Sequence, residues 1–203
     1  MAVEIRVAQP SDAAEILRIY APFCESTRVT FEVVPPSLED MRERIVRISA
    51  TYPWLVAEDG DRILGYVYAT RLRERAAYQW VVEVAVYISP EHQRRGLARV
   101  LYTTLFSLLR IQGYFKAFAS VSLPNDASQG FHQNLGFRPA GNFEGAGYKG
   151  GEWVDVGWWQ RELQPLVDAP LDPRSFPAIR NDPRIAAALA EGGRLANSRK
   201  DLR

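Results

Sequence analysis

A short polar segment has the residue types needed to bind phosphate. Gln93-Arg94-Arg95-Gly96-Leu97-Ala98 lies between an apolar run at 81–88 and an amphipathic helical pattern that begins at Gly96. A helix N-terminus presents unpaired backbone N–H groups and the positive end of the helix dipole. Gly96 and Ala98 let a phosphate approach that backbone, and the two arginines add charged donors. The segment predicts a pyrophosphate site; the alternative is an ordinary strand–loop–helix connection with a basic surface.

Two titratable residues are candidates for proton transfer. Glu83 is the only charged residue in the apolar stretch 80–88, and burial there would raise its pKa toward the range of a useful base. The alternative is a carboxylate at the strand rim or in an ion pair. His132 follows Leu123-Pro124-Asn125-Asp126 on an expected short helix. Its neutral imidazole can accept a proton, although a lone histidine on a helix is more often structural.

A strand, Q-x-x-G-x-A and a helix in this order resemble the acetyl-CoA signature of the GNAT N-acetyltransferase superfamily. The later segments 123–126 and 131–137 match further features of that family in the right order. Within it, the chain is most similar to the phosphinothricin and methionine sulfoximine acetyltransferase group, through residues 52–58, 77–80, 83, 86–90 and 155–160. The resemblance spans roughly residues 3–163.

The resemblance implies acetylation of the α-amino group of phosphinothricin, methionine sulfoximine or a related small amino acid, with acetyl-CoA as cosubstrate and direct transfer in a ternary complex. Glu83 and His132 match the catalytic positions of the group, and the choice of base between them stays open. The implied acetyl-CoA contacts are Val86, Tyr87, Ile88, Gln93, Arg94, Arg95, Gly96, Leu97, Ala98, Arg99, Asn125 and Ser128. The implied substrate contacts are Phe31, Arg73, Arg75, Tyr78 and Tyr87.

Several of these positions also have simpler explanations. Asn125 could cap the helix at 126, and the arginine-rich loop at 71–75 could be solvated. The group usually has lysine at the position of Arg73, and close relatives often have histidine where this chain has Gly150 and Val154. These departures allow a different acceptor preference.

Other functions are compatible with part of the pattern. Another amine, such as a protein N-terminus or a different amino acid, is the first alternative; a polyamine would require acidic residues rather than arginines. A non-catalytic acyl-CoA-binding protein is the second, but it would not need both Glu83 and His132. The resemblance also implies a homodimer, with Trp153, Trp158 and Trp159 as candidates for the subunit seam or for the core.

The composition sets broad limits on location and partners. The 203 residues carry a net charge of +1, with one cysteine and two histidines, so we expect neither a nucleic-acid or membrane partner nor a disulfide or metal site. The N-terminus lacks a secretory pattern and no apolar run is long enough to span a bilayer. We therefore expect a cytoplasmic protein.

The hydrophobic periodicity indicates which elements position these residues. We expect strands at 3–7, 54–58, 63–70, 80–88, 115–121, 137–148 and 152–162, and helices that begin near 11 and 37 and span 96–112 and 126–135. Hairpins at both ends predict a mixed α+β fold: a mostly antiparallel, twisted sheet of about seven strands with helices on both faces. Residues 1–163 form the expected GNAT domain. Residues 164–203 form a proline-rich extension, expected to be a surface arm or partly disordered, with one short helix at 185–190.

Overall fold

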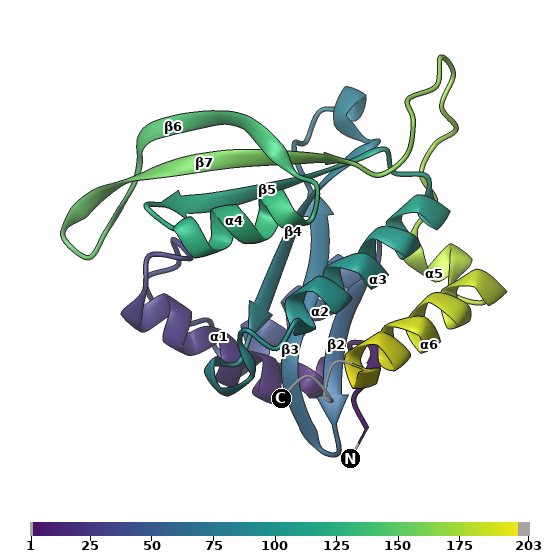
Figure 1. The fold of residues 1–203 in the computed structure, drawn as a ribbon, viewed down its shortest axis with the longest axis horizontal. Helices are drawn as coiled ribbons and strands as arrows, with labels where there is room; N and C mark the ends of the chain where they lie inside the picture. Colours follow the sequence, from purple (N-terminus) through teal and green to yellow (C-terminus); the bar gives the residue numbers. More distant parts are fainter. Residues whose placement is uncertain (1, 199–203) are drawn as a thin grey trace.

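A seven-stranded sheet organises the computed structural model, which describes residues 2–198 (Figure 1). The strand order is β1-β2-β3-β4-β5-β7-β6, and every neighbouring pair is antiparallel except β4 with β5. The strands are β1 (Glu4–Val7), β2 (Trp54–Asp59), β3 (Arg62–Arg71), β4 (Val81–Ile88), β5 (Lys116–Leu123), β6 (Arg138–Lys149) and β7 (Glu152–Glu162). The predicted mixed α+β fold with a mostly antiparallel sheet is confirmed.

Helices cover both faces of this sheet. They are α1 (Ala13–Ser26), α2 (Leu38–Ser49), α3 (Leu97–Gln112), α4 (Asp126–Asn134), α5 (Phe176–Ile179) and α6 (Pro183–Ser198), with single 3₁₀ turns η1 (Pro10–Asp12), η2 (Ala76–Tyr78) and η3 (Pro90–His92). None of the described helices combines the length and the apolar character that a membrane span requires.

Two hydrophobic cores form because successive strand residues point to opposite faces. In β2, Leu55 and Ala57 pack in the core beneath α3 and α6, whereas Trp54 and Val56 pack in the core beneath α1 and α2. The central strands are therefore buried on both faces and hold their register firmly.

The pairing of β4 with β5 ends early. It covers only Val81–Glu83 against Lys116–Phe118, although each strand is eight residues long. Beyond Glu83 the two strands diverge, and Figure 1 shows β5, β7 and β6 running in a different direction from β2, β3 and β4. The edge of β4 from residue 84 onward thus has no described strand beside it on that side.

Local sequence signals fix the helix ends that matter for this arrangement. Ser37 caps α2, and its Oγ accepts a hydrogen bond from the Asp40 amide at 3.1 Å, as its spacing predicts. Gly113 ends α3 in the left-handed conformation, with φ of 102°. Both boundaries agree with the prediction.

The C-terminal extension contains more regular structure than its composition indicates. The helix expected at 185–190 is part of the longer α6, which packs on α3 and β1. Ile185 and Ala196 enter the core, and the Asn197 side chain bonds both the amide and the carbonyl of Val3, each at 2.8 Å. The sequence predicts only the central part of this helix, and the packing of α6 on α3 and β1 extends it to Pro183–Ser198.

Gly192 allows α6 to approach α3 closely, which leads to a stability prediction. A Cβ at this position would lie 2.5 Å from Oγ1 of the buried Thr104. We expect Gly192→Ala to lower the free energy of unfolding by about 1–3 kcal/mol through overpacking. The adjacent Gly193→Ala is the matched control, because its Cβ would meet only an ordinary 3.6 Å contact. Urea unfolding of both variants tests this, and equal stabilities would contradict it.

Candidate active site

A cavity of about 450 Å³ opens where β4 and β5 diverge. The diverging strands, α4, the β6–β7 hairpin and the segment after α1 all contribute to its walls. Glu83 and His132, far apart in the sequence, both line it. The divergence of the strands thus creates the space, and the two candidate acid–base residues lie on its walls.

Glu83 is held partly buried at the last paired position of β4. It lies opposite Thr70 of β3 and Phe118 of β5. Burial is the main influence on its carboxyl group and raises its pKa; a 2.9 Å hydrogen bond from Ser120 Oγ and the positive charge of Arg73 act in the opposite direction. A carboxylate in this setting accepts a proton more readily than an exposed one.

His132 presents one free nitrogen. Its Nδ1 lies 2.8 Å from the Ser128 carbonyl oxygen, and because a carbonyl can only accept, Nδ1 carries the proton and Nε2 bears the lone pair. Nε2 is buried and has no hydrogen-bond partner among the described residues. Burial lowers the pKa of the imidazole despite the opposing effect of the Ser128 bond, and thus favours the neutral ring.

Aromatic contacts fix the orientation of the His132 ring. Phe137 and Phe131 meet it edge-on, with centroids at 5.1 and 5.4 Å, and Tyr102 of α3 does so at 5.9 Å. These contacts exclude water and restrict the rotamer. The lone pair at Nε2 is therefore preorganised.

The predicted phosphate segment forms a tight turn before α3. Arg94 and Gly96 both adopt left-handed backbone angles, with φ of 62° and 76°. The amides of Arg99 and Val100 bond back to the Gly96 carbonyl. Within the described chain, the amides of 94–98 donate to no acceptor, so they remain available to a ligand. Free amides at the positive end of a 16-residue helix, with exposed Arg94 and Arg95 beside them, fit a pyrophosphate.

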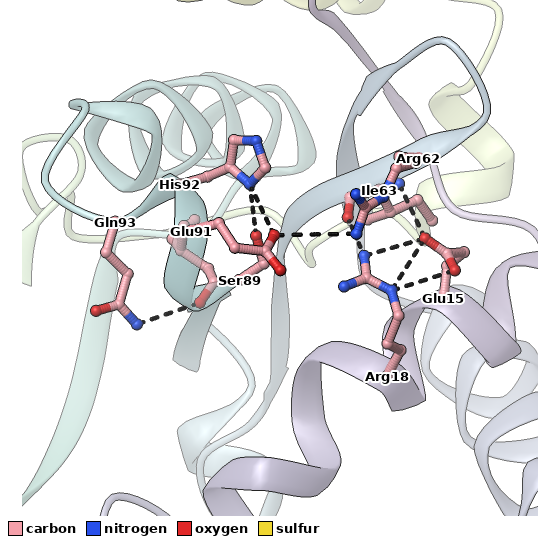
Figure 2. A network of polar contacts seen from close by, with 9 residues as sticks. Glu15, Arg18, Arg62, Ile63, Ser89, Glu91, His92 and Gln93 are labelled. Carbon is pink, nitrogen blue, oxygen red and sulfur yellow. Dashed lines mark hydrogen bonds and ion pairs between the residues drawn. The ribbon is translucent and has the colours of Figure 1, made fainter.

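Polar contacts attach the start of this segment to the rest of the fold (Figure 2). Ser89 Oγ lies 2.8 Å from His92 Nδ1, and Gln93 Nε2 donates to the Ile88 carbonyl at 3.4 Å. Glu91 lies between His92 and Arg62 at the start of β3. On the same side of Figure 2 as Arg62, the Arg18–Glu15 pair of α1 bonds the backbone of Ile63. The residues before the turn thus meet the start of β3 at Arg62, and α1 is bonded to the neighbouring Ile63.

The other residues predicted to bind acetyl-CoA differ in which of their groups can reach a ligand. Val86 and Tyr87 line the cavity on the part of β4 that no longer pairs with β5. Ile88 and Leu97 have core side chains, so only their backbone groups can reach a ligand. Ser128 lines the cavity, and Asn125 accepts a hydrogen bond from its amide at 3.1 Å, which realises the capping alternative. Three further positions flank the turn: Gln93 is exposed, Ala98 is half-buried and Arg99 donates to the Asn134 carbonyl.

The predicted substrate positions do not all lie together. Phe31 and Tyr87 line the cavity. The Arg73 guanidinium stands over the Trp158 ring with Cζ 5.4 Å from the centroid, and Trp158 itself lines the cavity. Arg75 and Tyr78 are exposed at η2 and are not part of the lining.

The three tryptophans considered for a seam have different environments. Trp158 faces the cavity, Trp159 is 4% exposed in the core, and Trp153 is 71% exposed on the β6–β7 hairpin. Of the three, only Trp153 has a mostly exposed side chain.

Sequence reasoning misses several residues of the cavity. Ser120 and Ser122 are not among the predicted site residues, yet β5 alternates these hydroxyls with the buried Ala119 and Val121. That period-2 pattern indicates a polar face and could have revealed them. Tyr68 and Tyr102 also line the cavity, and no local signal separates them from ordinary core aromatics.

Comparison with known proteins identifies the family. Residues 5–158 match the acetyltransferase (GNAT) domain family. The chain is 40% identical to a phosphinothricin N-acetyltransferase of Streptomyces viridochromogenes over 172 residues, covering 84% of this chain and 94% of the relative. It is 31% identical, over 84% of its length and all of the relative, to an L-methionine sulfoximine/L-methionine sulfone acetyltransferase of Pseudomonas aeruginosa.

A solved structure shares the fold. The crystal structure of a GNAT superfamily phosphinothricin acetyltransferase from Sinorhizobium meliloti in complex with acetyl-CoA superposes with a TM-score of 0.77 at 30% identity, covering 84% of this chain and 96% of that one. The family match, the sequence relatives and the fold agree, and the chain belongs to the GNAT family of acetyltransferases.

Proposed function

We propose that this GNAT protein acetylates the α-amino group of phosphinothricin, methionine sulfoximine or a related small amino acid. The single observation that carries the proposal is that Glu83 and His132, whose Nε2 has no partner among the described residues, line one cavity at the divergence of β4 and β5. Relatives with 31–40% identity carry the names of enzymes for these substrates. A cavity of about 450 Å³ suits a small acceptor together with the end of an acyl carrier.

The residues around the α3 N-terminus would hold acetyl-CoA, which supplies the activated acetyl group. The free amides of 94–98 and the side chains of Arg94 and Arg95 would bind its pyrophosphate. The unpaired edge of β4 beyond Glu83 offers backbone groups to the pantetheine amides, as an added strand would use them. With acetyl-CoA held in these two ways, its thioester would face the cavity between β4 and β5.

The chemistry requires one proton acceptor and one proton donor. Acyl transfer forms a nitrogen–carbon bond, breaks the carbon–sulfur bond and transfers one amine proton, finally to the thiolate. Glu83, with its raised pKa, would take the amine proton directly or through water. His132 Nε2 would accept or relay a proton near the leaving sulfur. Arg73, over Trp158, would attract the acidic group of the acceptor. Direct transfer in a ternary complex agrees with the lone Cys24 being buried in the core rather than exposed in the cavity.

Thiol release from acetyl-CoA tests this function. The acceptor panel contains phosphinothricin, methionine sulfoximine, methionine sulfone, ordinary amino acids, polyamines and peptides. We expect saturable turnover with the first three acceptors, and a loss of about 10²–10⁴-fold in kcat for Glu83→Gln and for His132→Ala. Acetyl-CoA affinity, measured by calorimetry, should change little in both variants. Tight acetyl-CoA binding without turnover on any acceptor would contradict the substrate assignment.

The pH dependence of the reaction isolates the role of Glu83. Protonation of its carboxylate removes the base as the pH falls through the raised pKa, which produces the acid limb of kcat/KM. The Ser120 hydrogen bond favours the ionised form, so Ser120→Ala should raise this pKa further and move the acid limb to higher pH. Ser122→Ala, in the same strand, is the matched control and should leave the limb in place. An unshifted limb in Ser120→Ala would argue against Glu83 as the titrating group.

We further propose that the enzyme is a homodimer joined through the β6–β7 hairpin. This hairpin presents Phe143, Tyr148 and Trp153 at 52%, 60% and 71% exposure, and the last two rings pack against each other. Clustered exposed aromatics are typical of interaction surfaces. Sedimentation equilibrium should give a dimer for the wild type and a monomer for Trp153→Asp; a wild-type monomer would refute this assembly.

A further inference from the structure

Lys149, at the end of β6, is a buried charge that the proposed chemistry does not use. Its side chain is largely covered, with 7% exposure for the residue. Nζ donates to the backbone carbonyls of Thr30 at 2.7 Å, Glu32 at 2.8 Å and Phe23 at 3.4 Å. The described residues place no carboxylate within ion-pair distance of it. An ammonium group has three donors, so these carbonyls account for all of them.

The three carbonyls belong to the end of α1 and to the segment that follows it. This segment, residues 27–36, contains no helix or strand, and it contributes Val29, Thr30 and Phe31 to the cavity wall. Three further contacts fix it: the Arg28–Glu152 and Arg44–Glu32 ion pairs, and the 2.8 Å hydrogen bond between Tyr20 and Thr30. A segment without secondary structure of its own depends on such contacts for its position.

Phe31 packs against bare backbone in β6. A Cβ at Gly147 would lie 2.5, 2.6 and 2.9 Å from three carbons of the Phe31 ring. The glycine therefore provides space for the ring. Gly147 also follows an irregular stretch of β6, where pairing with β7 shifts between Phe143 and Gly147. Phe143 and Ala146 of the same stretch line the cavity. The Phe31 ring therefore connects the wall formed by residues 29–31 with the wall formed by β6.

We propose that Lys149 is a positioning residue and Gly147 a specificity-determining residue for the acceptor amino acid. Lys149 holds residues 30–32 on the β6–β7 hairpin, and Gly147 receives the Phe31 ring, so that this ring becomes a fixed wall. The wall limits the size of the acceptor side chain. The inference rests on the proposed function and adds to it the residues that define the acceptor end of the cavity. The turn before α3 shares none of these contacts, so acetyl-CoA binding should be independent of them.

Lys149→Met tests the positioning role, because methionine keeps most of the length and loses all three donors. We expect the KM for the acceptor to rise about 10-fold to 100-fold, with the KM for acetyl-CoA unchanged. Hydrogen exchange followed by mass spectrometry should show faster exchange of the amides at 28–34 than in the wild type. Lys116→Met in β5 makes the same chemical change outside the cavity and should alter neither readout.

Gly147→Ala tests the packing against Phe31 independently. The added methyl group must displace the ring, so the acceptor KM should rise while the KM for acetyl-CoA stays the same. Combining it with Phe31→Leu removes ring atoms from the clash, and the effect of Gly147→Ala on the acceptor KM should be smaller in that background. Gly193→Ala, in α6, is the matched glycine control.

Unchanged exchange at 28–34 in a folded Lys149→Met protein would overturn the positioning role. Equal effects of Gly147→Ala with and without the Phe31→Leu substitution would overturn the specificity role. If Lys149→Met fails to fold, as judged by circular dichroism, Lys149→Gln replaces it, since glutamine retains a neutral donor and should give intermediate exchange. If the wild type acetylates none of the amino acids, the proposed function fails, and the exchange experiment still decides whether Lys149 holds the segment.

Discussion

The early end of the β4–β5 pairing is the constraint on which the rest of the site depends. Three residues of β4 pair with β5, and the strands then separate. Separation leaves one edge of a buried strand unpaired, which would be costly unless something else bonds to it. In the proposed function that partner is the pantetheine arm of acetyl-CoA. The same separation opens the cavity and places Glu83 at its inner end, where β4 is still paired on both sides.

Burial shifts the pKa values of Glu83 and His132 in opposite directions. It raises the pKa of Glu83 and lowers that of His132, in each case because the charged form loses hydration. A more basic carboxylate and a neutral imidazole in one cavity are suited to moving a proton between an amine and a thiolate at neutral pH. Two serines add to these effects. The Ser120 hydroxyl stabilises the Glu83 carboxylate, and the Ser128 carbonyl fixes the tautomer of His132.

Local features of the sequence predict local structure well. The cap at Ser37, the glycine at 113 and the turn before Leu97 are each identifiable because neighbouring residues determine them. Contacts between residues far apart in the sequence cannot be predicted in this way, because no neighbouring residue determines them. The Lys149 contacts join residues 117 to 126 positions apart, Trp158 lines the cavity, and α6 is much longer than expected. The resemblance brings Arg75 and Tyr78 into the substrate list, and the structure places both outside the cavity lining.

In the proposed function, acyl transfer takes place between the diverging strands, beside Glu83 and His132. A crystal structure with coenzyme A and an N-acetylated amino acid bound tests it most directly. We expect the pyrophosphate on the amides of 94–98, the pantetheine along β4 beyond Glu83, and the thiol within reach of His132 Nε2, with the acetylated nitrogen facing Glu83. A thiol outside the β4–β5 divergence, or an acceptor away from Glu83 and Phe31, would contradict it.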